Sequence, residues 1–227
     1  MGQSIIYKKF FGGGLKNNPK TNLVKLMYEK KEFLILVFTN LIVQLGITYY
    51  VMEKTNNPNI NIWALFAAQI IIILGITLIP MPEYIKFLIF CLFSYIFGLM
   101  LSPLKQKYNA QVIQIAIQGA LTVFAVFLAA GVALIAGGIN LGYKFGAMLF
   151  WALLLLIVFQ LVFVLGAKLP QAQKILSFVG IFIFALYVLY DTNKILQRDY
   201  YGDFITASMD YYLDIINLFT DFLGTNN

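Results

Sequence analysis

Long apolar segments separated by short polar breaks follow one another along most of the chain. They lie at about 33–52, 61–79, 84–101, 110–136, 141–165 and 171–190, and a more polar seventh follows at 203–223. Most of them approach the roughly 20 residues that a membrane-spanning helix needs. The breaks are rich in Pro, Gly, Asn and charged residues, which favour turns. The pattern predicts an all-α integral membrane protein with seven transmembrane helices and places the chain in a lipid bilayer.

Composition supports a membrane protein with a single domain. Of the 227 residues, 61% are hydrophobic and only 11% are charged, which exceeds the apolar share of ordinary soluble domains. No break is long enough to separate two domains. We therefore expect a basic N-terminal arm at 1–31, with "FGGGLKNNP" as a flexible lead-in, and one seven-helix transmembrane domain at 32–227.

The basic residues predict an orientation rather than a nucleic-acid partner. With the N-terminus in the cytoplasm, 11 of the 16 Lys and Arg residues lie inside, as the positive-inside rule requires. Seven belong to the arm, and the other four are Lys86, Lys144, Lys194 and Arg198. The net charge of +6 is thus explained by the cytoplasmic flank, and we expect no nucleic-acid binding.

The absence of histidine and the presence of a single cysteine exclude several kinds of functional site. Without an imidazole there is no histidine base, no histidine metal ligand and no histidine pH switch. Cys91 lies in an apolar segment, where packing is its expected role, and it has no partner for an internal disulfide. We expect neither a cofactor nor an enzymatic activity.

The seventh segment carries an acidic stripe. At 100° per residue, five polar residues fall within an arc of about 60°: Asp203, Asp210, Asp214, Asn217 and Asp221. A helix lying on the membrane surface usually presents Lys and Arg to anionic lipid, so an acidic face would be repelled. In a spanning helix each central Asp costs about 2.5 to 3.5 kcal/mol, so the stripe must face protein or water. The acids could simply join helices by hydrogen bonds, but Asn or Ser would do so at a lower cost.

Asp191 on the preceding segment is the expected partner of this stripe. It lies eleven residues before Gly202, and Asp214 lies twelve residues after it. Two antiparallel helices joined at Gly202 would bring Asp191 and Asp214 to a similar depth, and Asp210 is the alternative if the turn is centred one or two residues earlier. No basic residue stands directly beside either acid in the sequence. Such a pair resists double ionisation and retains one proton, and a hard cation such as Ca²⁺ can replace that proton.

Other polar side chains in the apolar segments are candidates for modulating the site or lining a hydrated route. One set on the fourth segment comprises Gln111, Gln114, Gln118 and Thr122, and one on the first comprises Asn40, Gln44 and Thr48. Hydrogen bonding between helices is the commoner role of such residues in membranes. The candidate modulators or pore-lining residues are Asp210, Asn217, Asp221, Gln69 and Gln118.

Three motifs carry a family resemblance: "LYDTNKI" followed by "YYLDIINLF", and "FGLMLSPL" at 97–104. Together they resemble the Bax inhibitor-1, or transmembrane Bax inhibitor motif, family. The resemblance implies seven helices with the last one central, a pH-sensitive calcium leak, and suppression of cell death at internal membranes in eukaryotic members. Asp191 and Asp214 match the paired aspartates of the family. Some members place an arginine on the second helix that reaches this pair, whereas "ILGITLIPMPE" here contains only Glu83, and the nearest cation is Lys86.

Two further functions compete with a cation leak gated by Asp191 and Asp214. The protein could regulate cell death through membrane protein partners without conducting ions, with the aspartates serving only packing. A membrane enzyme that uses aspartates to activate water is the third alternative, but the Gly-x-Gly-Asp setting of presenilin-type proteases is missing around both residues. The expected location is an internal membrane, endoplasmic reticulum or Golgi, in a eukaryotic or viral setting and the cytoplasmic membrane in a bacterium.

Overall fold

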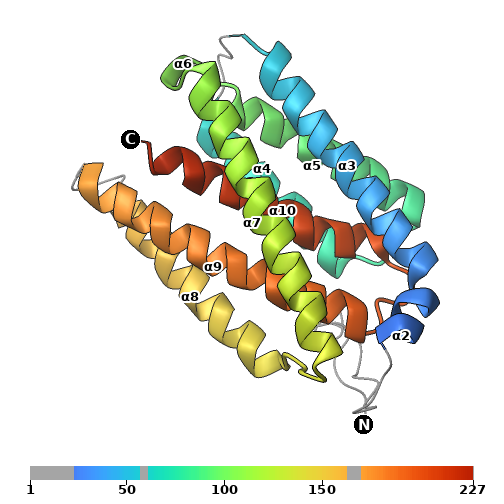
Figure 1. The fold of residues 1–227 in the computed structure, drawn as a ribbon. Coiled ribbons are helices and arrows are strands. Elements are labelled where there is room, and N and C mark those ends of the chain that lie inside the picture. Colours follow the sequence, from blue (N-terminus) through green and yellow to red (C-terminus); the bar gives the residue numbers. More distant parts are fainter. Residues whose placement is uncertain (1–22, 57–60, 163–169, 227) are drawn as a thin grey trace. The chain divides into compact units, whose positions relative to one another are not determined.

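The computed structural model describes residues 23–56, 61–162 and 170–226 (Figure 1). In this part of the chain every regular element is a helix. The helices are α2 (Leu23–Glu29), α3 (Lys31–Lys54), α4 (Ile62–Leu78), α5 (Glu83–Leu101), α6 (Leu104–Lys107), α7 (Ala110–Ala136), α8 (Tyr143–Val162), α9 (Pro170–Gln197) and α10 (Phe204–Gly224). The seven long helices coincide with the seven predicted segments, so the all-α prediction is confirmed.

Several helices have the length and hydropathy of membrane spans. Among the described residues five candidates qualify: α3, α5 together with α6, α7, α8 and α9. Helix α4 is apolar but shorter, at 17 residues, and α10 carries the acidic stripe. The chain is therefore an integral membrane protein, as predicted, while a total of seven crossings stays a prediction.

The predicted N-terminal arm is described only in part. Residues 1–22 lie outside the described residues, so the prediction of a flexible lead-in is untested there. The remainder contains α2, a helix of seven residues whose Leu26 is buried. The arm thus includes a packed helical turn that the sequence pattern did not predict.

The described chain forms two compact units, and α10 begins in the first and ends in the second. The first unit comprises Glu29–Asn109 and Asp199–Tyr212, and within it α5 packs against both α3 and α4. A Cβ atom at Gly98 would lie 2.7 Å from the Cβ of Val51 and from the backbone oxygen of Thr48. The glycine of the "FGLMLSPL" motif therefore allows α3 and α5 to approach closely.

A buried hydrogen-bond network joins α3, α5 and the start of α10 in this unit. Gln44 donates to Asn40 (3.0 Å) and accepts a hydrogen bond from Ser94 (2.7 Å). Thr48 is hydrogen-bonded to the hydroxyl of Tyr212, with 2.6 Å between the oxygens, and Asn40 also donates to Ser208. The polar stripe of the first segment is thus a connection between helices, which confirms that interpretation over a hydrated route.

The second unit contains α7, α8, α9 and the rest of α10, and α9 packs against both α7 and α8 (Figure 1). Two glycines make these contacts close. A Cβ atom at Gly131 on α7 would lie 2.7 Å from the Cβ of Thr192, and one at Gly146 on α8 would lie 2.4 Å from the ring of Tyr190. The half of α9 that carries Asp191 is therefore fixed from two sides.

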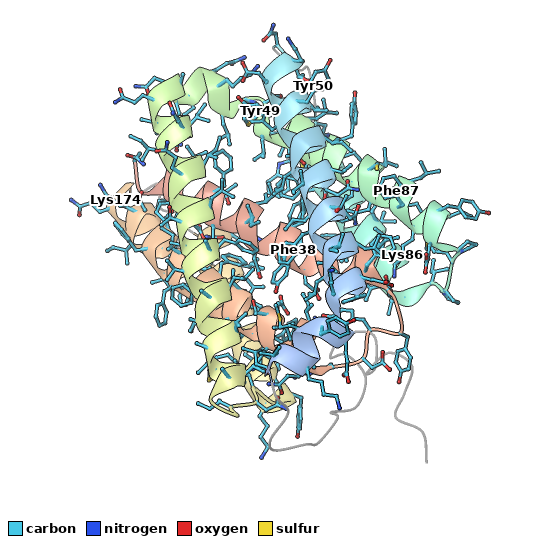
Figure 2. The ribbon with its side chains drawn as sticks, turned by 45° about the vertical axis from the view of Figure 1, so that its right-hand side comes forward. Phe38, Tyr49, Tyr50, Lys86, Phe87 and Lys174 are labelled. Carbon is cyan, nitrogen blue, oxygen red and sulfur yellow. The ribbon has the colours of Figure 1, made fainter. Side chains whose placement is uncertain are left out.

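Three contacts between helix ends agree with the predicted alternation of loops. Lys105 donates to the backbone oxygen of Glu53, and both lie where the topology places the outer side. Lys86, which Figure 2 labels at the beginning of α5, forms an ion pair with Asp203 before α10. Asn193 near the end of α9 donates to the backbone oxygen of Ile139 between α7 and α8. Each contact joins segments that the prediction places on one side of the membrane.

Helix α10 is mostly buried, and one of its faces is half-buried, along Asp210, Leu213, Asn217, Thr220 and Gly224. None of its residues is exposed, and its largest side chains, Tyr211 and Tyr212, are among the most completely buried in the chain. The central position of the last helix stays a prediction.

Candidate cation site

The site is built on the contact between α9 and α10 in the second unit. A Cβ atom at Gly180 would lie 2.1 Å from Oδ2 of Asp221, and one at Gly224 would lie 2.1 Å from Oγ of Ser177. The two contacts pair residues whose numbers have the same sum, as they must in two antiparallel helices. Continued along the helices, this register places Asp214 level with Tyr187.

This register corrects the predicted depth of the aspartates. Helix α9 continues to Gln197 and α10 begins at Phe204, so the hairpin is centred between Tyr200 and Tyr201 instead of at Gly202. This is the earlier centre for which the sequence offered Asp210 as the alternative partner of Asp191. Asp191 therefore lies four residues, or about 6 Å along the helix axis, from the level of Asp214. The two acids lie on facing helices, offset by one turn.

Tyr187 is a neighbour of both acids. It is on the same face of α9 as Asp191, one turn away, and the carboxylates of Asp191 and Asp214 both act electrostatically on its hydroxyl group. Only 6% of Asp191 and 3% of Asp214 is exposed. The structure thus brings the two predicted site residues into one buried neighbourhood, with Tyr187 as a member that the sequence analysis missed.

A basic residue lies beside Asp191 in the structure, although none adjoins it in the sequence. Nζ of Lys194 lies 3.4 Å from Oδ1 of Asp191, and both side chains are buried. The signal was available in the sequence, because residues three apart on a helix share a face. Hydropathy ended the sixth segment at residue 190 and so left Lys194 outside the helix that it belongs to.

The neighbours of Asp191 in the "YDTN" motif hold this turn of α9 in place. Tyr190 packs against Gly146, and Thr192 packs against Gly131. Asn193 donates from Nδ2 to the backbone oxygen of Ile139 (3.1 Å) and accepts from the backbone N–H of Leu141 through Oδ1 (2.9 Å). Each of these residues therefore fixes the position of Asp191 by contact with a different part of the unit.

A second buried cation, Arg198, completes this end of α9. Its guanidinium group donates to the hydroxyl oxygen of Tyr190 and to the backbone oxygen of Leu141, both at 3.0 Å. Only 4% of the residue is exposed. Arg198 thus ties the end of α9 to the loop between α7 and α8.

The other acids of the stripe have separate environments. Asp210 accepts a hydrogen bond from the hydroxyl of Tyr200 (2.8 Å). Asp203 precedes α10 and caps it, accepting from the backbone N–H of Thr206 (3.0 Å), and it forms the ion pair with Lys86. Asp221 is buried, and its Oδ2 has no hydrogen-bond partner among the described residues. Asp203 is therefore a helix cap, while Asp221 is a buried acid two turns from Asp214.

The remaining candidates are neutral. Asn217 donates to the backbone oxygen of Leu213 within α10 (2.7 Å). Gln69 on α4 donates to the backbone oxygen of Phe93 on α5 (3.0 Å), and its Oε1 is buried without a partner in the described structure. Gln118 is exposed on α7, on the side opposite the buried Ala116 and Ala120. A pore-lining role of Gln69 and Gln118 stays a prediction.

The donor set suits a weakly held hard cation. No group of three or more acidic, Cys or His side chains that could hold a metal occurs in the described part of the chain. Two carboxylates and neighbouring neutral oxygens would bind Ca²⁺ with few charges, and few charged ligands give low affinity.

The family assignment follows from comparison with known proteins. The family model described as "Inhibitor of apoptosis-promoting Bax1" matches residues 27–225. The chain therefore belongs to the Bax inhibitor family of helical membrane proteins, as the sequence motifs indicated.

Individual relatives match over shorter lengths. The chain is 35% identical over 79 residues to Protein LIFEGUARD 1 of Arabidopsis thaliana, covering 35% of this chain and 34% of the relative. It is 29% identical over 157 residues to Bax inhibitor 1 of Schizosaccharomyces pombe, covering 68% and 56%. It is 35% identical over 80 residues to the Golgi anti-apoptotic protein of vaccinia virus, covering 35% and 33%. The chain thus spans about a third of the length of the plant and viral relatives.

Proposed function

We propose that this protein is a pH-sensitive calcium leak channel whose gate is the pair Asp191 and Asp214. The observation that carries the proposal is the burial of both acids on facing helices, one turn apart, beside the same tyrosine. Two carboxylates in a poorly solvated place repel each other, so a proton or a cation must compensate their charge. A site that exchanges one for the other responds to pH without histidine.

The proposed cycle has two states. With a proton on the pair, the negative charge is reduced and α9 and α10 pack closely. When the proton leaves, the repulsion between Asp191 and Asp214 is relieved by a calcium ion, which their oxygens and neutral neighbours coordinate. Because only two charged ligands hold it, the ion leaves again easily, which conduction requires.

The names of the relatives extend the proposal to cell death. Bax inhibitor 1 and the Golgi anti-apoptotic protein are named for suppressing it, and a calcium leak gives such proteins a physical means to act. We infer that this chain adjusts the calcium content of a membrane compartment and thereby modulates cell death where its host has that response. The proposal involves no enzymatic step.

The test is calcium flux into liposomes that contain the purified full chain and a calcium dye. We expect a pH-dependent flux in the wild type and the loss of its pH dependence in Asp214→Asn. Lys144→Met, at an exposed position of α8, is the matched control and should conduct like the wild type. No flux in the wild type, or an unchanged pH profile in Asp214→Asn, would reject the channel. A variant without flux that still protects cells would favour the partner-based function.

A further inference from the structure

Lys194 is placed unusually for a lysine of a membrane helix. Its side chain is 6% exposed and that of Asp191 is 8% exposed, with 3.4 Å between Nζ and Oδ1. By contrast, Lys174 near the other end of α9 is exposed and extends away from the protein (Figure 2). Removing an ammonium group from water is costly, so its burial requires compensation. The carboxylate of Asp191 supplies that compensation.

The two buried cations at this end of α9 have different tasks. Arg198 directs its guanidinium group to Tyr190 and Leu141, as described above, and so serves the fold. Lys194 directs its ammonium group to the acid that we assign to the cation site. A lysine is a compact charge on a flexible stem of four carbons, which can move without unfolding the helix. Lys194 is thus the mobile one of the two.

We propose that Lys194 is a tethered counter-cation of the site, which occupies Asp191 when no metal is bound and which an entering divalent ion must displace. The proposal rests on the proposed function and adds its regulation. Among the described residues, Asp191 pairs with the ammonium, Tyr187 and Tyr190 interact with it electrostatically, and Asp214 and Arg198 act on these same two tyrosines. Asp191 attracts the ammonium of Lys194, so a divalent ion competes with Lys194 for this carboxylate.

The end of α9 can accept the ammonium group of Lys194 when a divalent ion displaces it from Asp191. Lys194 lies in the last turn of α9, where the backbone carbonyl groups and the helix dipole favour a positive charge. An ammonium group that leaves Asp191 can turn toward this helix end while its Cα stays fixed. The tether would keep the affinity for calcium low and prevent permanent occupation of the site.

If the pair of Asp191 and Lys194 served only the fold, substitution of Lys194 would have a different effect on calcium binding. A buried ion pair can often be replaced as a whole by apolar residues without loss of stability, whereas removal of one partner leaves the other charge buried and uncompensated. Methionine at position 194 would fill the same space without a charge. If Lys194 only supports packing, its replacement by methionine should leave the affinity for calcium unchanged.

The experiment measures calcium binding directly, by titration calorimetry of the full chain in lipid nanodiscs. We expect Lys194→Met to bind Ca²⁺ about tenfold more tightly than the wild type, because a charge that repels the ion is removed. Lys194→Arg keeps the charge and should stay within about threefold of the wild type. Lys144→Met removes a charge from the exposed beginning of α8 and should leave the affinity unchanged. Unchanged or weaker binding in Lys194→Met would overturn the proposal.

A second variant keeps the test decisive if Lys194→Met does not fold. Lys194→Gln removes the charge but keeps a hydrogen-bond donor for Asp191, so it decides the question if Lys194→Met is not monodisperse. The two proposals fail in different ways. Absent calcium binding in the wild type, or binding unaffected by Asp214→Asn, would reject the cation site itself. If calcium binding is lost in Asp214→Asn but does not change with the charge at residue 194, only the proposed role of Lys194 is rejected.

Discussion

The carboxyl group of Asp221 lies directly against the backbone of Gly180. A Cβ atom at residue 180 would lie 2.1 Å from Oδ2 and 2.6 Å from Cγ of Asp221, closer than any real contact allows. Helices α9 and α10 can meet at this distance only because residue 180 is glycine. The contact fixes the register of the two helices and with it the relative depth of Asp191 and Asp214.

Gly180→Ala should therefore destabilise the fold. The added methyl group forces α9 and α10 apart, and such overpacking costs about 1 to 3 kcal/mol. The apparent unfolding temperature of the purified protein measures the loss. Gly46→Ala is the control, because nothing lies within 4 Å of a Cβ atom at that position of α3. Equal effects of the two substitutions would contradict the close contact, and Gly180→Ala with Asp221→Ser should recover part of the loss.

Asn193 should prove essential for the end of α9. Asn193→Ala removes two hydrogen bonds to the loop between α7 and α8 and leaves the N–H of Leu141 without that partner. We expect a loss of about 2 to 3 kcal/mol in the free energy of unfolding. Gln197→Ala provides the control, since Gln197 donates to the same oxygen of Ile139 from a half-buried position. A loss in Gln197→Ala as large as that in Asn193→Ala would argue against the special role of Asn193.

Tyr212 makes a testable connection in the first unit. Its hydroxyl is hydrogen-bonded to Thr48, and its ring lies edge-on to those of Phe90 and Phe93. Tyr212→Phe keeps the ring and removes the hydroxyl, so we expect a loss of about 1 kcal/mol in the free energy of unfolding. Tyr95→Phe, at an exposed position of α5, should leave the stability unchanged. Thermal unfolding of both variants under the same conditions measures the two effects. Equal stability losses in Tyr212→Phe and Tyr95→Phe would contradict the role of the Tyr212 hydroxyl.

The seven long helices could be predicted from the sequence because membrane segments are recognised by their length and hydropathy. The sequence predicted the acids for a related reason, since a charged residue among apolar ones is costly and therefore informative. It missed α2, whose seven residues are too short and too polar to give a hydropathy signal.

The details of the site depended on information that hydropathy does not carry. Residues 191–196 are buried against protein, so they include polar side chains such as Asn193 and Lys194 while remaining helical. The apolar pattern therefore ended about two turns before α9 itself, and Gly202, as a turn residue, was taken as the centre of the hairpin. The register needed the contacts of Gly180 and Gly224, which lie far from Asp191 in sequence.

Proton release on calcium binding tests the central claim most directly. The claim is that Asp191 and Asp214 exchange a proton for a metal ion, and metal binding to protonated ligands must release protons. In weakly buffered nanodiscs near neutral pH, calcium added to the wild type should release up to about one proton for each ion bound. Asp214→Asn should release none. Saturable calcium binding without proton release, or equal release from Asp214→Asn, would contradict the account.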